Sequence, residues 1–477
     1  MSELFGRLKA KYASFSAPVR ASFWTLVCSV FQSAVSLVTT PVFTRILTQE
    51  EFGIYNQYSS WLAILSILIT LNLPSETYLR GLTDHEQDEN AFTSIMLGES
   101  IAIFCIFLLL FLLAPSFWAK LFNLTPLLAA MMFVHLFVST PFDYWKSRER
   151  SHYRYKLSSL LSVLVTLLSY GFSIQAVRMS ADFRLEARVA GDLAVRVLVG
   201  VPLLVLLLWK GKKLYDRAVW LSALAFSIPL IPHYLSGIIL NQSDRIMIGQ
   251  MAGNAEAGRY SIAYMIASMV LMIVTAINSS YVPFTFQKLK SGEPNAIYSS
   301  SRILFAGIAL LCLGAMGLAP EVITVFAGEG YSEAAGIVPS VSASVFFIFV
   351  CTLFSNVEYH YKKTQWIGAA TLAAAVLNVS LNALLIPVYG YMAAGATTLI
   401  SYLFLAVFHY LVYRKIQQEE GLPAVYDLKL ITASGTLLIV LTALARFLMP
   451  YPILRWIIVL VSSAAALILI ISALKRR

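Results

Sequence analysis

The sequence predicts an all-α integral membrane protein with about fourteen transmembrane helices, divided into two equivalent halves and a final pair of helices. Hydrophobic residues make up 58% of the 477 positions and charged residues only 13%, a composition unlike that of soluble domains. Apolar runs of about 20 residues recur along the chain, each long enough to cross a hydrocarbon core of roughly 30 Å. One motif also occurs twice, about 200 positions apart, which is typical of transporters built from repeats.

Hydropathy defines the predicted spans and the parts of the chain. We expect an N-terminal cytoplasmic segment over 1–21, six-helix halves over 22–208 and 218–413, and two last helices with a basic tail over 428–477. The predicted spans cover residues 22–41, 54–73, 92–113, 125–142, 157–177, 189–208, 218–240, 257–282, 297–319, 336–357, 365–386, 391–413, 428–449 and 453–474.

The 35 lysines and arginines fall mostly in alternate connections between the spans. Because cytoplasmic loops are enriched in these residues, this bias predicts that both termini are cytoplasmic. The net charge of +10 is then mainly a topology signal and gives little support to nucleic-acid binding. Apolar and basic residues alternate over residues 4–15, which predicts a short amphipathic helix on an anionic leaflet; a solvated basic tail explains the same pattern.

The repeated motif consists of an arginine, an apolar stretch, a polar turn and a Gly-x-Tyr step into the next span. Arg45 and Arg245 lie 200 positions apart, and the Gly-x-Tyr steps that begin at Gly53 and Gly258 lie 205 apart. We therefore expect the two halves to be related by a rotation about the membrane normal, as parallel repeats are.

The four cysteines all fall inside apolar runs, so we expect neither disulfides nor a metal site. No hydrophilic connection is long enough to fold as a domain, and there is no Gly-rich loop ending in Lys-Ser or Lys-Thr that would grip the phosphates of ATP. The sequence therefore favours a carrier over an enzyme, with no cofactor.

Three stretches carry a resemblance to a known family: SLVTTPVFTRILTQEEFGIYNQY, DRIMIGQMAGNAEAGRYSIAY and LNVSLNALLIPVYGYMAAGATTLISY. They resemble the Wzx-type polysaccharide flippases of bacterial inner membranes, whose superfamily includes multidrug extrusion antiporters and the lipid II flippase. The resemblance implies two six-helix bundles around a central cavity that opens alternately to either side. It also implies a substrate made of undecaprenyl diphosphate carrying a short oligosaccharide, such as an O-antigen unit.

Charged residues within or beside the spans are the candidate site residues, because a charge at the bilayer centre costs about 2.5–3.5 kcal/mol on insertion scales. Glu76 and Arg80 follow Pro74 on the second span, four positions apart and so on one helical face. Arg80 resembles an arginine often found at this point in the family and would hold a diphosphate; a structural pair with Glu76 is the alternative. Arg45 either lines the outer mouth of the cavity or satisfies carbonyls at a helix end.

Asp244 and Arg245 are adjacent, so they cannot face one another on a helix, and each needs its own partner. They either contact substrate or set the turn between two spans. Asp192 and Arg196 lie on one face of the sixth span and form either a buried pair lining the cavity or a coupling-ion site.

Arg302 adds a positive charge to the ninth span, and Glu358 ends the tenth. Glu358 and the two aspartates above are the candidates for ion coupling or ion pairing. His135 and His409 lie alone in apolar runs, where we expect them to pack rather than relay protons. A basic and aromatic stretch on the cytoplasmic side, and its counterpart after the tenth span, either attract phosphate and lipid head groups or simply follow the charge bias of inner loops. Its candidate residues are Lys146, Arg148, Arg150, Arg154, Lys156, Lys362 and Lys363.

The leading functional prediction is a flippase that moves a lipid-linked oligosaccharide from the cytoplasmic to the periplasmic leaflet of the bacterial inner membrane. Its expected partners are that lipid, anionic phospholipids and the polysaccharide polymerase machinery. The alternative within the superfamily is a cation-coupled multidrug exporter, whose cavity would need acidic residues where the arginines favour an anion. A membrane polymerase or ligase would need a large outer loop, which the sequence lacks. The coupling ion, H+ or Na+, stays open.

Overall fold

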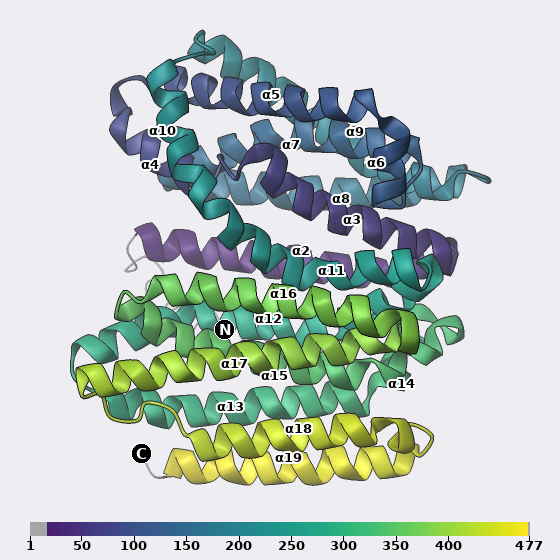
Figure 1. The fold of residues 1–477 in the computed structure, drawn as a ribbon, viewed down its shortest axis with the longest axis vertical. Helices are drawn as coiled ribbons and strands as arrows, with labels where there is room; N and C mark the ends of the chain where they lie inside the picture. The colour runs from purple at the N-terminus through teal and green to yellow at the C-terminus, as the bar shows by residue number, and fades with distance from the viewer. Residues whose placement is uncertain (1–16, 476–477) are drawn as a thin grey trace, which may run out of the picture. The chain divides into compact units, whose positions relative to one another are not determined.

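The computed structural model describes residues 17–475, and within that range the chain is all α-helix apart from short connections and 3-10 turns (Figure 1). The predicted segment 1–21 therefore lies almost wholly outside the described residues. The helices are α2 (Ala17–Ile46), α3 (Gln49–Thr70), α4 (Glu76–Asp84), α5 (Glu89–Leu113), α6 (Pro115–Phe122), α7 (Pro126–Ser151), α8 (Tyr155–Met179), α9 (Arg184–Gly211), α10 (Arg217–Ser227), α11 (Ile231–Met251), α12 (Asn254–Lys290), α13 (Pro294–Gly317), α14 (Ala319–Ala327), α15 (Val338–His360), α16 (Thr364–Tyr389), α17 (Met392–Glu420), α18 (Leu428–Leu448) and α19 (Pro452–Lys475).

Twelve helical segments of the described chain are long and apolar enough to cross a membrane. Ten of them lie within single helices. One joins the 3-10 turn Glu86–Asp88 to α5, and another joins α10 and α11 across the 3-10 turn Ile228–Leu230. Pro229 lies within that turn. Each of the twelve coincides with a predicted span. The two remaining predicted spans correspond to α3 and α19.

The helix α3 is not among the twelve because its first half is polar. Gln57 and Ser60 are both fully buried. Gln57 donates to the Asn254 side chain at 2.6 Å, and Ser60 donates to Gln242 at 3.1 Å. Buried protein contacts, rather than lipid, therefore account for the polar residues of this helix. In α19 only Pro452–Ser462 is a described apolar segment, shorter than a span.

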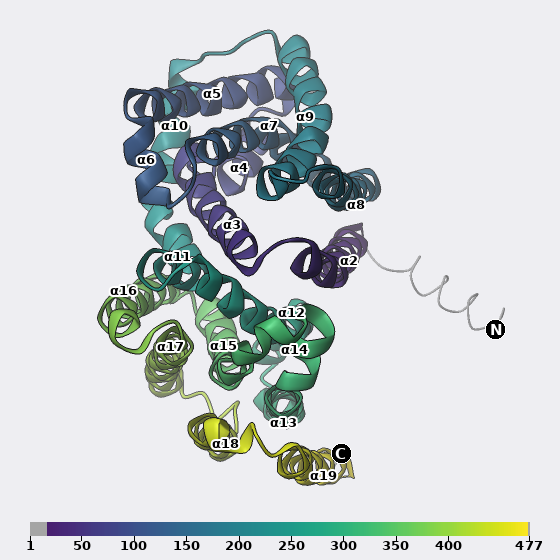
Figure 2. The same cartoon turned by 90° about the vertical axis from the view of Figure 1, so that its right-hand side faces the viewer.

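The chain divides into two compact units. Unit 1 comprises Trp61–Pro232 together with the chain up to Ile46, and unit 2 comprises Leu47–Ser60 and His233–Arg477. Within unit 1, α8 packs against both α2 and α9, while α7 packs against α9. Within unit 2, α15 packs against α12 and α17, and Figures 1 and 2 show α18 and α19 side by side beyond α13 and α15. The rotation predicted to relate the two halves stays a prediction.

Helix ends repeat between the two parts of the chain. The helices α7 and α15 both end in a residue of left-handed conformation, Tyr153 with φ 57° and Lys362 with φ 58°. The residue that follows each, Arg154 or Lys363, donates its backbone N–H to the carbonyl five positions earlier, at 2.8 and 2.9 Å. These are the bonds of a Schellman-type helix end, and all the corresponding positions differ by 209.

The motif that suggested the repeat is only partly equivalent in structure. The helix ends Ile46 and Met251, and the helix starts Gln49 and Asn254, are each 205 positions apart, the offset of the Gly-x-Tyr steps. Arg45 is the last residue but one of α2, whereas Arg245 lies six residues before the end of α11. The match between the two arginines is therefore wrong. The same bounds correct a second expectation, since Asp244 and Arg245 lie inside a helix and not at a turn.

The glycines of that motif contact one another inside unit 2. A Cβ on Gly53 would lie 1.7 Å from the carbonyl oxygen of Asn254, and a Cβ on Gly258 would lie 2.6 Å from the carbonyl oxygen of Gln49. Because Gln49 and Asn254 start their helices at equivalent positions, the contact is reciprocal: each helix brings its glycine against the first turn of the other. Only glycine allows this close approach of α3 to α12.

We expect Gly53→Ala to lower the thermal unfolding midpoint of the purified protein, because its Cβ would force the two backbones apart. Overpacking of this kind costs about 1–3 kcal/mol. Gly307→Ala is the matched control, since a Cβ at that helical position of α13 meets nothing within 4 Å; it should leave the midpoint unchanged or raise it. Equal midpoints for the two variants would show that the crossing tolerates a methyl group.

Candidate functional site

A buried carboxylate at the centre of unit 2 joins four helices. Asp244, in α11, is 1% exposed. Its carboxylate accepts hydrogen bonds from Tyr260 of α12 at 2.5 Å, from Asn382 of α16 at 2.6 Å and from Thr398 of α17 at 2.6 Å. A buried carboxylate is tolerated only when such donors replace the water it has lost. These three donors therefore replace the hydrogen bonds to water that the Asp244 carboxylate loses on burial inside the helix bundle.

The network continues along α16 and α17. Asn382 also contacts Thr397 in a short hydrogen bond and donates to the side-chain oxygen of Asn378 at 3.2 Å. Ser243 donates to that same Asn378 oxygen at 2.9 Å. The cluster thus gathers carboxylate, amide and hydroxyl oxygens from helices far apart in the sequence. Oxygen donors of this kind suit a hard cation, so Asp244, Asn378 and Thr398 are the residues that could hold one.

Arg245 points away from this cluster. Its guanidinium donates to the Asn241 carbonyl and to the Gln242 side chain, both at 2.9 Å, and lies 4.4 Å from the centre of the Tyr264 ring. The prediction that Asp244 and Arg245 have separate partners is confirmed.

A second buried pair in unit 2 joins α15 to α17. Glu358 is fully buried, His409 is 2% exposed, and the Glu358 Oε1 atom lies 2.8 Å from His409 Nδ1. Glu358 was predicted as an ion-pairing candidate, whereas His409 was expected to pack alone, and that expectation is wrong. Among the described residues, the other carboxylate oxygen of Glu358 has no hydrogen-bond partner.

A cluster of charged residues in unit 1 lies between α7 and α9. Arg196 donates to Asp192 at 2.9 Å, within one helix as predicted. His135, from α7, places its Nδ1 atom 3.5 Å from the same carboxylate. The histidine was expected to pack alone, so the structure corrects this expectation too. Since Asp192 already neutralises Arg196, the latter offers less positive charge to a substrate than the sequence suggested.

The remaining arginine candidates occupy different settings. Arg80 lies on the separate short helix α4 and not on the second predicted span, because the chain breaks at Leu71 and Asn72, both with positive φ. Its exposed guanidinium stacks 5.0 Å from the Phe226 ring centre, while Glu76 is exposed on the first turn of α4. Arg302 forms an ion pair at 3.1 Å with Asp427, the N-cap residue of α18. Arg45 lies in the last turn of α2.

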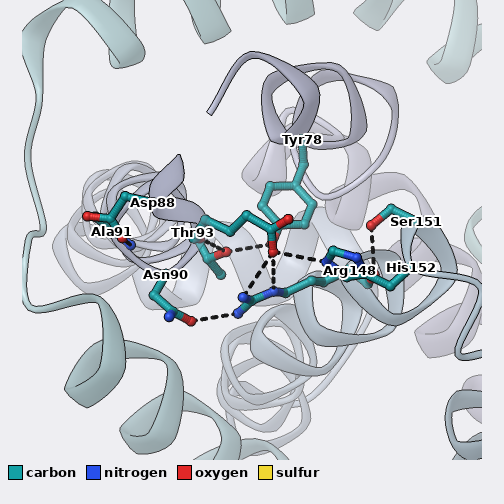
Figure 3. A network of polar contacts seen from close by, with 9 residues as sticks. Tyr78, Asp88, Asn90, Ala91, Thr93, Arg148, Ser151 and His152 are labelled. Carbon is teal, nitrogen blue, oxygen red and sulfur yellow. Dashed lines mark hydrogen bonds and ion pairs between the residues drawn. The ribbon is translucent and has the colours of Figure 1, made fainter. Parts of the chain in front are cut away.

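The basic stretch at the end of α7 contains paired and unpaired charges. Arg148 donates to one carboxylate oxygen of Glu89, at 3.2 Å from Nε and 3.0 Å from Nη2, and to Asn90 at 2.9 Å. His152 Nε2 lies 2.9 Å from the same oxygen. Figure 3 shows this network, with Asn90, Arg148 and His152 among its labelled side chains. Arg148 therefore ties α7 to the start of α5, a role that the sequence did not indicate.

Other cations of these loops also have acidic or polar partners. Lys146 pairs with Asp143 at 2.9 Å, and Arg150 donates to Ser147 at 3.2 Å. Lys363 pairs with Glu419 at 2.9 Å, and hydrogen bonding to that carboxylate raises the pKa of Lys363. Lys362 is the left-handed residue at the end of α15.

Two of the predicted lipid-attracting residues, Arg154 and Lys156, form no ion pair with any described residue, and both are exposed. They flank the start of α8, at Tyr155. Their positive charge is therefore available to an anionic ligand, unlike that of Arg148.

The sequence analysis identified the charged site residues more often than it identified the residues that bind them. Tyr260, Asn382 and Thr398 lie within the three stretches that carry the family resemblance, which was the one available signal. No sequence signal pointed to Glu89, since it stands in an acidic run that is typical of a solvent-exposed loop. Glu99 was also missed: it is 1% exposed within α5, and neither of its carboxylate oxygens has a hydrogen-bond partner among the described residues.

Removing Arg148 should destabilise the protein, because Glu89 would keep its charge in a site that is only 18% exposed. We expect Arg148→Ala to cost about 1–3 kcal/mol, measured as a lower thermal midpoint, and Glu89→Gln added to it to recover part of the loss. Arg154→Ala is the matched control, from the same stretch but without an ion pair, and should leave the midpoint unchanged. Equal losses for both arginines would contradict a structural role for the Arg148 pair.

Comparison with known proteins identifies the family of this chain and proteins that share its fold. A family model described as polysaccharide biosynthesis protein matches residues 19–289. Lsg locus putative protein 1 of Haemophilus influenzae is 24% identical over 176 residues, which make up 35% of this chain and 42% of that relative. The succinoglycan biosynthesis transport protein ExoT of Rhizobium meliloti is 23% identical over 69% of the chain and 67% of its own length.

Two solved structures share the fold. The lipid II flippase MurJ in an inward closed conformation matches with a TM-score of 0.69 and 13% identity, over 94% of this chain and 97% of its own. An inward-facing multidrug resistance MATE family transporter of the MOP superfamily matches with a TM-score of 0.58 and 12% identity, over 82% and 96%. The family model covers more than half of the sequence, and the fold is that of MurJ and MATE transporters. The chain therefore belongs to the polysaccharide biosynthesis protein family.

Proposed function

We propose that this protein is a flippase that carries an undecaprenyl-diphosphate-linked oligosaccharide from the cytoplasmic to the periplasmic leaflet of the bacterial inner membrane by alternating access. Membership of the polysaccharide biosynthesis family over residues 19–289 is the observation that carries the proposal. A polysaccharide assembled outside the inner membrane from units made in the cytoplasm would need a step that moves the polar unit across hydrocarbon. A passive crossing is prohibitive for a charged, hydrated head group.

Arg80 is our candidate for contact with the diphosphate. It is exposed on α4, and stacking on Phe226 would orient the guanidinium without consuming its hydrogen-bond donors. A planar fork of donors suits phosphate oxygens better than the point charge of a lysine. Glu76, on the same helix, would bias the position of Arg80 until substrate arrives.

Asp244 is our candidate for ion coupling. Its oxygen-rich surroundings on α11, α12, α16 and α17 could exchange hydrogen bonds for a bound Na+ or for a proton on the carboxylate. Either event removes a net negative charge from the interior of the bundle and would shift the balance between conformations. Glu358 with His409, and Asp192 with His135, are paired ionisable sites that offer second candidates for protons.

A multidrug exporter is the alternative, supported by the fold likeness to a MATE transporter. The two functions predict different phenotypes. A deletion strain should accumulate the undecaprenyl-linked unit on the cytoplasmic side and lose its surface polysaccharide, measured by extraction of labelled lipid intermediates and by polymer staining. Normal polymer together with a new sensitivity to cationic drugs would contradict the flippase and favour the exporter.

Substitution of the coupling candidate gives a sharper test. In proteoliposomes loaded with lipid-linked oligosaccharide, we expect Asp244→Asn to abolish translocation driven by a Na+ or H+ gradient, imposed separately, while the protein keeps a normal abundance and elution profile. Asp143→Asn is the control, since Asp143 is half-exposed and pairs with Lys146 on its own helix; it should transport normally. Wild-type rates for Asp244→Asn under both gradients would exclude Asp244 as the coupling site.

A further inference from the structure

An apolar groove runs between α2 and α8 in unit 1. It has a volume of about 530 Å3. On each helix the lining residues recur at steps of three and four, which is the spacing of one helical face. The lining residues are Trp24, Val27, Cys28 and Phe31 from α2, and Lys156, Ser159, Leu160 and Val163 from α8.

The groove is open along its length. Trp24 is 37% exposed, Phe31 45% and Leu160 57%. On a membrane-spanning segment such residues face hydrocarbon, so an apolar chain could enter from the bilayer without passing through the protein. A face of this kind with no charged partner would be ordinary lipid-facing surface, and the argument therefore depends on what stands at its end.

Positive charge gathers at one end of the groove. Lys156 lines it in the first turn of α8, and Arg154 precedes that helix. Arg20 stands four positions before Trp24, one turn along the same face of α2, and its Nε atom is buried without a hydrogen-bond partner among the described residues. With the amino terminus in the cytoplasm, as the charge bias predicts, this end of the groove faces the cytoplasm.

The cations at this end differ from their neighbours. Lys146 and Arg148, on the same stretch of chain, are held by Asp143 and Glu89. Arg154 and Lys156 form no ion pair within residues 17–475. Cations without an acidic partner among the described residues, beside an apolar groove, match an amphiphile with an anionic head and an apolar chain.

We propose that the groove between α2 and α8 binds the polyprenyl chain of the lipid carrier, with its diphosphate against Lys156, Arg154 and Arg20. This inference rests on the proposed function and identifies a site at which the substrate would first dock. A single groove lined by two helix faces accommodates one chain, whereas a membrane phospholipid has two. Three cations also suit the multiple charges of a diphosphate better than a single phosphodiester.

The test uses the full-length protein in nanodiscs of phosphatidylcholine, titrated with fluorescent undecaprenyl diphosphate. Leu160→Trp fills the groove, and we expect it to raise the Kd about tenfold, or ~1.4 kcal/mol. Leu157→Trp is the matched control, since Leu157 lies on the same helix, is also 57% exposed and does not line the groove; its Kd should stay within about twofold of wild type. Lys156→Glu should weaken binding more at low salt than at high salt.

Each further outcome is decisive. An unchanged Kd in both Leu160→Trp and Lys156→Glu would overturn the groove as the site, even if the wild type binds and translocates its substrate. Loss of co-purified phosphatidylglycerol from Leu160→Trp, with an unchanged Kd for undecaprenyl diphosphate, would overturn it in favour of a phospholipid site. If the wild type binds no undecaprenyl diphosphate and its deletion strain makes normal polymer, the proposed function fails together with the site.

Discussion

The cost of an unpaired charge in hydrocarbon is the constraint on which this structure depends. Few ionisable side chains enter the spans, and most of those that do are compensated by a partner from another helix. Asp244 is held by Tyr260, Asn382 and Thr398, and Glu358 is held by His409. Because each pairing links two different helices, the same contacts that make the charges tolerable also fix how the helices of a unit pack.

The two parts of the chain share their helix ends but differ in their polar interiors. Glu149 and Glu358 stand at equivalent positions, one turn before the left-handed residues that end α7 and α15, and both are buried. In unit 1, Gly200 of α9 lies so close to α7 that a Cβ there would be 1.9 Å from the Val138 carbonyl oxygen, whereas in unit 2 the Glu358 and His409 pair joins α15 to α17. Close backbone packing thus joins two helices of unit 1, and a buried pair joins two helices of unit 2, so similar helix ends do not imply similar polar interiors.

This asymmetry is relevant to transport. A carrier that alternates between two conformations needs an ionisable group whose charge can change at tolerable cost. In unit 2 such a group is surrounded by neutral donors that can reorient, whereas in unit 1 Asp192 is held by Arg196 and His135. A neutral hydroxyl or amide exchanges partners more readily than an arginine gives up a carboxylate, which is why the surroundings of Asp244 favour it as the coupling candidate over Asp192.

The sequence by itself determined the helical membrane class, most of the spans and the presence of Asp244, Glu358 and Arg148 as costly charges. These follow from composition and from the length of apolar runs, which are local properties. Only the tertiary structure decided which charges are satisfied. Arg148 donates to Glu89, 59 positions away in the sequence. Asp244 accepts from Asn382 and Thr398, at separations of 138 and 154. Such partners depend on which helix faces meet, and that depends on the packing of α3 on α12 or of α15 on α17, where a single glycine or a buried histidine decides the fit.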